Sequence, residues 1–81
     1  MSLHTGSEGD DVLELQQALN QLGFGLDEDG IFGQNTHNAV ITLQTIFGYD
    51  VDGIVGPATR KLIHQKAGCG WNLEAARNAS G

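Results

Sequence analysis

Carboxylates gather in two short stretches of this 81-residue chain, residues 27–30 (Asp-Glu-Asp-Gly) and residues 50–53 (Asp-Val-Asp-Gly). Each has the residue order found in the middle of an EF-hand calcium loop, in which the glycine is the sixth of twelve positions. In that register the first and last ligand positions fall on residues that carry no carboxylate: Gly25, Thr36, Gly48 and Thr59. Since most of the charge that would hold the ion is missing, we expect no metal site and no cofactor.

The histidines and the cysteine do not form a catalytic or zinc-binding pattern. His4, His37 and His64 lack the HExxH spacing, so we expect surface or boundary histidines, with His4 at a frayed end. Cys69 stands alone, which leaves an incidental thiol or an intermolecular disulfide. Paired carboxylates can act as acid and base, but a chain this small has little means of burying one of them. We therefore predict no catalytic residue.

The two acidic stretches belong to a longer repeat. Residues 29–36 read Asp-Gly-Ile-Phe-Gly-Gln-Asn-Thr and residues 52–59 read Asp-Gly-Ile-Val-Gly-Pro-Ala-Thr, so five of eight positions agree. In each copy we expect the aspartate to accept backbone hydrogen bonds, the first glycine to take a positive φ and the isoleucine to point inward. The second glycine should cap a helix, and the threonine hydroxyl should bond the turn. The repeat predicts two helix-starting turns that are mainly architectural, with a ligand-lining role left open.

Apolar residues at three- and four-residue steps predict the helices that these turns connect. The first follows a cap at Ser7 or Gly9 and ends at Leu22, the second spans residues 34–47, and the third runs from Pro57 to about residue 66. The inward-facing residues of the first two helices are expected to be Val12, Leu15, Leu19, Leu22, Ala39, Val40, Leu43, Ile46 and Phe47. The predicted fold is all-α, a small three-helix bundle.

The sequence leaves alternatives open for the C-terminal stretch, residues 68–81. We expect one or two further helical turns at residues 73–78, and Trp71 either folds back onto the bundle or is exposed to a partner. The domain itself is assigned to residues 7–67, between an N-terminal extension or overhang (residues 1–6) and a tail or linker (residues 68–81). We expect a monomer.

The charge distribution excludes some partners. The net charge is −6, nine of the ten acidic residues lie at or before Asp52, and the only Lys and Arg residues are Arg60, Lys61, Lys66 and Arg77. A nucleic-acid binder would present a basic face to the phosphates, so nucleic acid is not an expected partner. No apolar run approaches the roughly 20 residues of a membrane span.

The same residues resemble a known family. The resemblance rests on Gly9-Asp10-Asp11-Val12, Leu15-Gln16, Leu22-Gly23, both Asp-Gly-Ile-x-Gly turns with their threonines, Leu43-Gln44 and Leu62. This pattern is similar to the peptidoglycan-binding domains that target bacterial and phage cell-wall hydrolases to their substrate. The resemblance implies three helices joined by the repeated turns, and non-catalytic binding of peptidoglycan.

This resemblance sets the expectations for function. The implied role is to tether a covalently attached catalytic domain to the wall, in an extracytoplasmic location (cell wall or periplasm). The candidate ligand-binding residues flank the turns and helix starts: Asp29, Asn35, Thr36, Gln44, Tyr49 and Asp52. Gln16 and Gln44 are a further pair of interest, with a helix-surface or interhelical hydrogen bond as the alternative. A protein-interaction or propeptide-like regulatory module of a protease is the second functional hypothesis.

Overall fold

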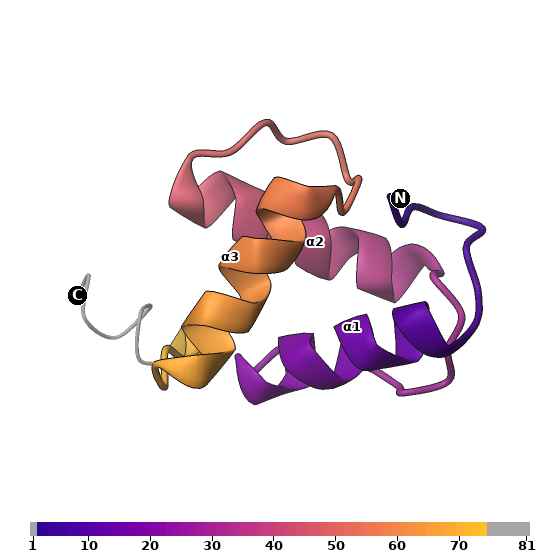
Figure 1. Cartoon of the computed structure of the whole chain (residues 1–81), viewed down its shortest axis with the longest axis horizontal. Coiled ribbons are helices and arrows are strands. Elements are labelled where there is room, and N and C mark those ends of the chain that lie inside the picture. Colours follow the sequence, from indigo (N-terminus) through magenta and orange to yellow (C-terminus); the bar gives the residue numbers. More distant parts are fainter. Residues whose placement is uncertain (1, 75–81) are drawn as a thin grey trace.

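A computed structural model describes residues 2–74, which fold into the predicted three-helix bundle (Figure 1). The helices are α1 (Asp10–Gln21), α2 (Gln34–Phe47) and α3 (Pro57–Gly68). Figure 1 shows α3 crossing in front of α2 and running down to one end of α1, which lies below α2 and contacts α3. Within the described residues, extended pairing is limited to two isolated bridges. The all-α prediction is confirmed.

The helix ends follow from the glycines that the sequence places there. Gly9, Gly33 and Gly56 are the N-caps of α1, α2 and α3, and none of the three caps involves a side-chain hydrogen bond. Gly48 ends α2 in the left-handed conformation with φ 73°, a region that costs glycine little. The predicted caps at the start of each helix and the predicted stop of α2 are confirmed.

The core is built from the predicted helix stripes with one exception. Val12, Leu19, Leu22, Val40 and Leu43 are fully buried, and Leu15 and Ala39 are nearly so. Ile46, however, is 45% exposed, because it lies on the outer side of the last turn of α2. Phe47 is half-buried against the edge of the core.

The isoleucines of the repeated turns do not point inward, which corrects our expectation. Ile31 and Ile54 are 53% and 41% exposed, whereas the following residues, Phe32 and Val55, are each 1% exposed. Each isoleucine is engaged in its turn through the backbone, since its N–H donates to the aspartate and its C=O accepts from the glutamine. The neighbouring side chains, Phe32 and Val55, enter the core instead.

The N-terminal segment packs across both turns. Leu3 is 5% exposed, and its N–H and C=O pair with Val55 at 3.0 and 2.7 Å. Further along, Phe32 donates to Ser7 at 2.9 Å, and Gly6 donates back to Phe32 at 3.1 Å. The expected division at residue 6 stays a prediction, but residues 3–9 supply one core side chain and satisfy backbone groups of both turns.

The segment after α3 folds back onto the bundle. The Trp71 ring lies 5.1 Å from the Phe47 ring, and the Leu73 N–H donates to Leu22 O at 2.7 Å. Leu73 is 7% exposed. The hypothesis that Trp71 packs against the bundle is therefore confirmed. Residues 73 and 74 are helical, and the remainder of the helical turns expected at residues 73–78 lies outside the described residues.

Candidate functional site

A buried glutamine organises the first turn. Gln16 of α1 is 1% exposed, and its amide nitrogen donates to Asp29 Oδ1 at 3.0 Å, Ile31 O at 2.9 Å and Thr36 Oγ1 at 3.1 Å. Its amide oxygen accepts the N–H of Gly30 at 2.9 Å. One side chain thus joins α1, the turn and the first turn of α2.

A second glutamine repeats this arrangement one helix later. Gln44 of α2 is also 1% exposed, and it donates to Asp52 Oδ1 at 3.0 Å, Ile54 O at 3.0 Å and Thr59 Oγ1 at 3.4 Å. Its amide oxygen accepts the N–H groups of Asp52 and Gly53 at 3.2 and 3.1 Å. The duplicated motif is therefore a four-part unit of glutamine, aspartate, turn backbone and threonine.

These contacts separate the predicted site residues into two clusters. Asp29 and Thr36 lie in the first cluster, and Gln44 and Asp52 lie in the second. The Thr36 hydroxyl, which was expected to bond the turn, instead accepts from the glutamine that holds the turn. Thr36 and Gln44 are almost completely buried. The interhelical hydrogen bond expected as the alternative for the two glutamines is confirmed, since each bonds the threonine of the next helix. Their bonds to the turn backbone and aspartates were not predicted, and the repeated Leu-Gln pair was the only signal for them. A ligand role for these side chains stays a prediction.

Hydrogen bonds lower the pKa of both turn carboxylates below the ordinary value of 3.8. At Asp29 the backbone N–H of Ile31 has the largest effect and the Gln16 amide the next, while desolvation acts in the opposite direction. At Asp52 the pKa falls for the same reasons, first because of the Ile54 N–H and then the second glutamine. Both groups are therefore ionised hydrogen-bond acceptors at neutral pH.

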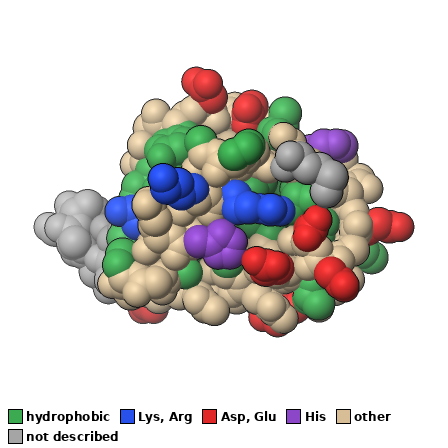
Figure 2. Space-filling view, in the orientation of Figure 1, with side chains coloured by type: hydrophobic (Ala, Val, Ile, Leu, Met, Phe, Trp, Pro, Cys, Tyr) green, Lys and Arg blue, Asp and Glu red, His purple; other side chains and the backbone are tan. Residues whose placement is uncertain are grey.

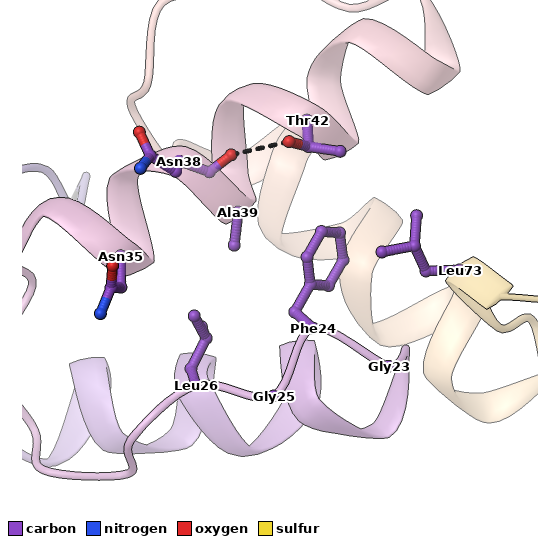
Figure 3. A pocket seen from close by; sticks show the side chains of 9 residues that line it. All are labelled: Gly23, Phe24, Gly25, Leu26, Asn35, Asn38, Ala39, Thr42 and Leu73. Carbon is purple, nitrogen blue, oxygen red and sulfur yellow. Dashed lines mark hydrogen bonds between the residues drawn. The ribbon is translucent and has the colours of Figure 1, made fainter. Parts of the chain in front are cut away.

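An open groove of about 480 Å³ lies between the α1–α2 loop and α2 (Figure 3). Phe24 and Leu26 line it from the loop, and Ala39 lines it from α2. Its polar wall is a row on α2: Asn35, Asn38 and Thr42. Leu73 lines it from the C-terminal segment, and in Figure 3 the side chains of Phe24, Leu26 and Asn35 project into the space between the loop and α2.

A smaller hollow of about 160 Å³ shares one residue with this groove. Asn35 lines both, and the smaller hollow also borders Asp27, Asp29, Thr36 and the outward-pointing Ile31. Three of the predicted site residues, Asp29, Asn35 and Thr36, are thus brought together at the start of α2. The structure does not bring the other three to this place, since they belong to the end of α2 and the α2–α3 loop.

Tyr49 lies in the α2–α3 loop with 39% of its surface exposed, and its N–H donates to Gln44 O at 2.9 Å. It is accessible to a ligand, as the expected ligand-binding role requires. Exposed apolar side chains also occur near it in the sequence, at Ile46, Val51 and Ile54.

The charged groups outside the turns lie mainly on α1 and α3. Arg60 and His64 of α3 border a shallow surface with Asp11 and Glu14 of α1, and His64 Nε2 lies 3.7 Å from Glu14 Oε1. Figure 2 shows Lys and Arg beside His and acidic side chains on the face that carries α3. Among residues 2–74, no three His, Cys, Asp or Glu side chains lie close enough together to hold a metal ion. No helix in this range is long and apolar enough to cross a membrane.

Comparison with known proteins identifies relatives of the chain. A spore cortex-lytic enzyme of Halalkalibacterium halodurans is 51% identical over 61 residues, which cover 74% of this chain and 18% of that protein. The N-acetylmuramoyl-L-alanine amidase CwlM of Mycobacterium tuberculosis is 48% identical over 58 residues, covering 69% of this chain and 14% of the amidase. The chain therefore spans less than a fifth of either relative.

A solved structure and a family model agree with these relatives. The crystal structure of the SleB N-terminal domain superposes with a TM-score of 0.79 at 35% identity, over 83% of this chain and 93% of that one. The family model described as "Putative peptidoglycan binding domain" matches residues 8–63, which include α1, α2, both repeated turns and the first half of α3. The chain belongs to this peptidoglycan-binding domain family.

Proposed function

We propose that the chain is a non-catalytic module that binds peptidoglycan and holds a cell-wall hydrolase near its substrate. The observation that carries this proposal is the family match over residues 8–63, which spans both glutamine-held turns. The relatives support the second half of the proposal, because the matched region is a small part of proteins named as a cortex-lytic enzyme and an amidase.

The chemistry of the carboxylates supports binding rather than catalysis. A general acid needs a raised pKa so that it carries a proton near neutral pH. The pKa values of Asp29 and Asp52 are shifted in the opposite direction by the hydrogen bonds that hold the turns. These aspartates are thus suited to fixing a rigid surface.

The mechanism is tethering. Binding of one module to an insoluble polymer raises the effective concentration of a linked domain at that polymer, and a weak module is sufficient for this. The substrate is extracytoplasmic, so the parent protein acts in the cell wall or periplasm. The chain needs no cofactor for this role, and we expect it to act as a monomer without nucleic-acid partners.

Co-sedimentation tests the proposal. The isolated chain should pellet with purified sacculi across a range of salt concentrations and should release no soluble muropeptides during the incubation. Complete retention in the supernatant would contradict wall binding, and it is the result expected if the module instead regulates a protease. Release of muropeptides would contradict the non-catalytic assignment.

A further inference from the structure

We propose that peptidoglycan is bound in the groove between residues 23–26 and α2, and that the groove takes a methyl-bearing amide, namely the acetamido group of an N-acetyl sugar. This inference rests on the proposed function. An alanine residue of the stem peptide offers the same methyl–amide chemistry, so the experiment below distinguishes the two sources.

The first argument is the asymmetry of the two repeats. The glutamine-held turn occurs twice, but the pair of asparagine amides beside it occurs once: Asn35 and Asn38 of α2 correspond to Ala58 and Lys61 of α3. The span also differs, because thirteen residues separate Gln16 from Asp29 whereas eight separate the second glutamine from its aspartate. The longer first connection supplies the loop wall of the groove, and the shorter second connection has no counterpart of this wall.

The second argument is that the added loop is held in one shape. Asn20 of α1 donates to Leu26 O at 2.8 Å and accepts the Leu26 N–H at 2.6 Å, and it also donates to Glu28 at 2.9 Å. At the other end of the groove, Leu73 is fixed by its hydrogen bond to Leu22 O. A preformed groove binds with a smaller loss of conformational entropy than a flexible loop would.

The third argument concerns hydrogen bonding on the polar wall. Asn38 Oδ1 accepts from Gln34 at 2.9 Å, and the Thr42 hydroxyl donates to Asn38 O at 2.9 Å. The Asn35 side chain has no hydrogen bond to any residue in the range 2–74. Its amide can therefore both donate to and accept from a ligand amide, while Phe24, Leu26 and Ala39 offer apolar contacts to a methyl group (Figure 3).

The fourth argument is charge. No residue that lines this groove is ionisable, and Arg60, Lys61 and Lys66 belong to α3. A carboxylate of a stem peptide would have no cationic partner in this groove, and the net charge of −6 does not favour an anion. The N-acetyl group is neutral, and the volume of about 480 Å³ is within the range of roughly 300–1,000 Å³ usual for ligand sites.

Chemical-shift mapping of the whole chain tests the inference with three probes. The probes are N,N′-diacetylchitobiose, cellobiose, which has hydroxyls in place of the acetamido groups, and the stem dipeptide L-alanyl-D-isoglutamine. We expect the first probe to shift the backbone amides of residues 23–26, 35–42 and 73, and cellobiose to leave them unchanged. Asn35→Ala should weaken binding of the first probe by about two- to tenfold, as expected for one lost hydrogen bond. Gln65→Ala, an exposed change on α3, should not.

The outcomes separate this inference from the proposed function. Shifts in the groove with the dipeptide alone would refute the N-acetyl sugar as the ligand and assign the groove to the stem peptide. Shifts confined to residues 49–55, or unaltered binding by Asn35→Ala, would refute the groove as the binding site even if the chain still binds sacculi. Failure to bind sacculi at all would instead refute the proposed function.

Discussion

Replacing Gln16 by Ala tests whether the glutamine holds the first turn. The substitution removes all four hydrogen bonds between this side chain and the turn, which are 2.9–3.1 Å long. Gly30 N–H and the buried Thr36 hydroxyl would then lose their glutamine partner. Water cannot easily replace it, because the glutamine itself is 1% exposed.

The expected loss of stability is large for a chain of this size. Each buried polar group that loses its partner costs about 1–3 kcal/mol, so two such groups give about 2–6 kcal/mol in the free energy of unfolding. The whole stability of a small domain is about 5–15 kcal/mol. The variant should therefore unfold at a much lower urea concentration than the parent chain.

Urea unfolding followed by circular dichroism at 222 nm measures this loss. Gln17 provides a matched control, since it is the same residue type at the next position of α1 and its side chain is exposed. We expect Gln17→Ala to change the free energy of unfolding by less than about 0.5 kcal/mol. If Gln16→Ala behaved like Gln17→Ala, the first turn would be held by other contacts and our reasoning would be refuted.

Three further changes test other parts of the fold. The double variant Asp29→Asn/Asp52→Asn should lose less unfolding free energy than the parent chain when the pH is lowered, as measured by urea titrations at several pH values. The reason is that the ionised carboxylates stabilise the fold fully above pH 3.8 and less as the pH falls through their lowered pKa values. An equal loss in both chains would contradict this. Leu3→Ala should cost about 2 kcal/mol in unfolding free energy, and a neutral effect would show that the N-terminal segment is dispensable. Gly53→Ala should cost more than Gly48→Ala, measured by thermal denaturation, because both have φ near 73° but only at the former would a Cβ collide with a side chain, the His37 imidazole; equal costs would contradict that contact.

The sequence predicted the helices and turns well because local rules determine them. The stripe Val12, Leu15 and Leu19 has helical spacing, and glycine at both Gly33 and Gly56 leaves few alternatives for the start of a helix. The positive φ expected for the first glycine of each turn is also observed, at 72° in both copies.

The sequence-based predictions failed where burial depends on contacts between residues far apart in the sequence. The isoleucine of each turn was expected to be buried, but its backbone bonds to the aspartate and glutamine, and only tertiary contacts decide which neighbour enters the core. The burial of Leu3 depends on pairing with Val55, more than fifty residues away in the sequence. No local pattern in residues 1–6 indicates this pairing.

The candidate site was predicted only in part for the same reason. Asn35 was singled out from its place at a helix start, and the structure puts it at the junction of two hollows. Phe24, Leu26 and Leu73 were not considered, since the groove they line exists only when loop, helix and C-terminal segment come together. Both copies of the repeat contain the same Asp-Gly-Ile-x-Gly-x-x-Thr motif, so the motif alone does not indicate which copy lies beside a binding groove.

A binding isotherm to purified sacculi, measured for three forms of the chain in one buffer, tests the account most directly. The forms are the parent chain, Asn35→Ala in the groove and Gln65→Ala on α3. We predict that the parent chain and Gln65→Ala bind equally, and that Asn35→Ala requires severalfold more sacculi for half-saturation while retaining its helical circular dichroism spectrum. Three coincident isotherms would contradict the assignment of the groove, and absence of binding by all three would contradict the role of the domain in wall attachment.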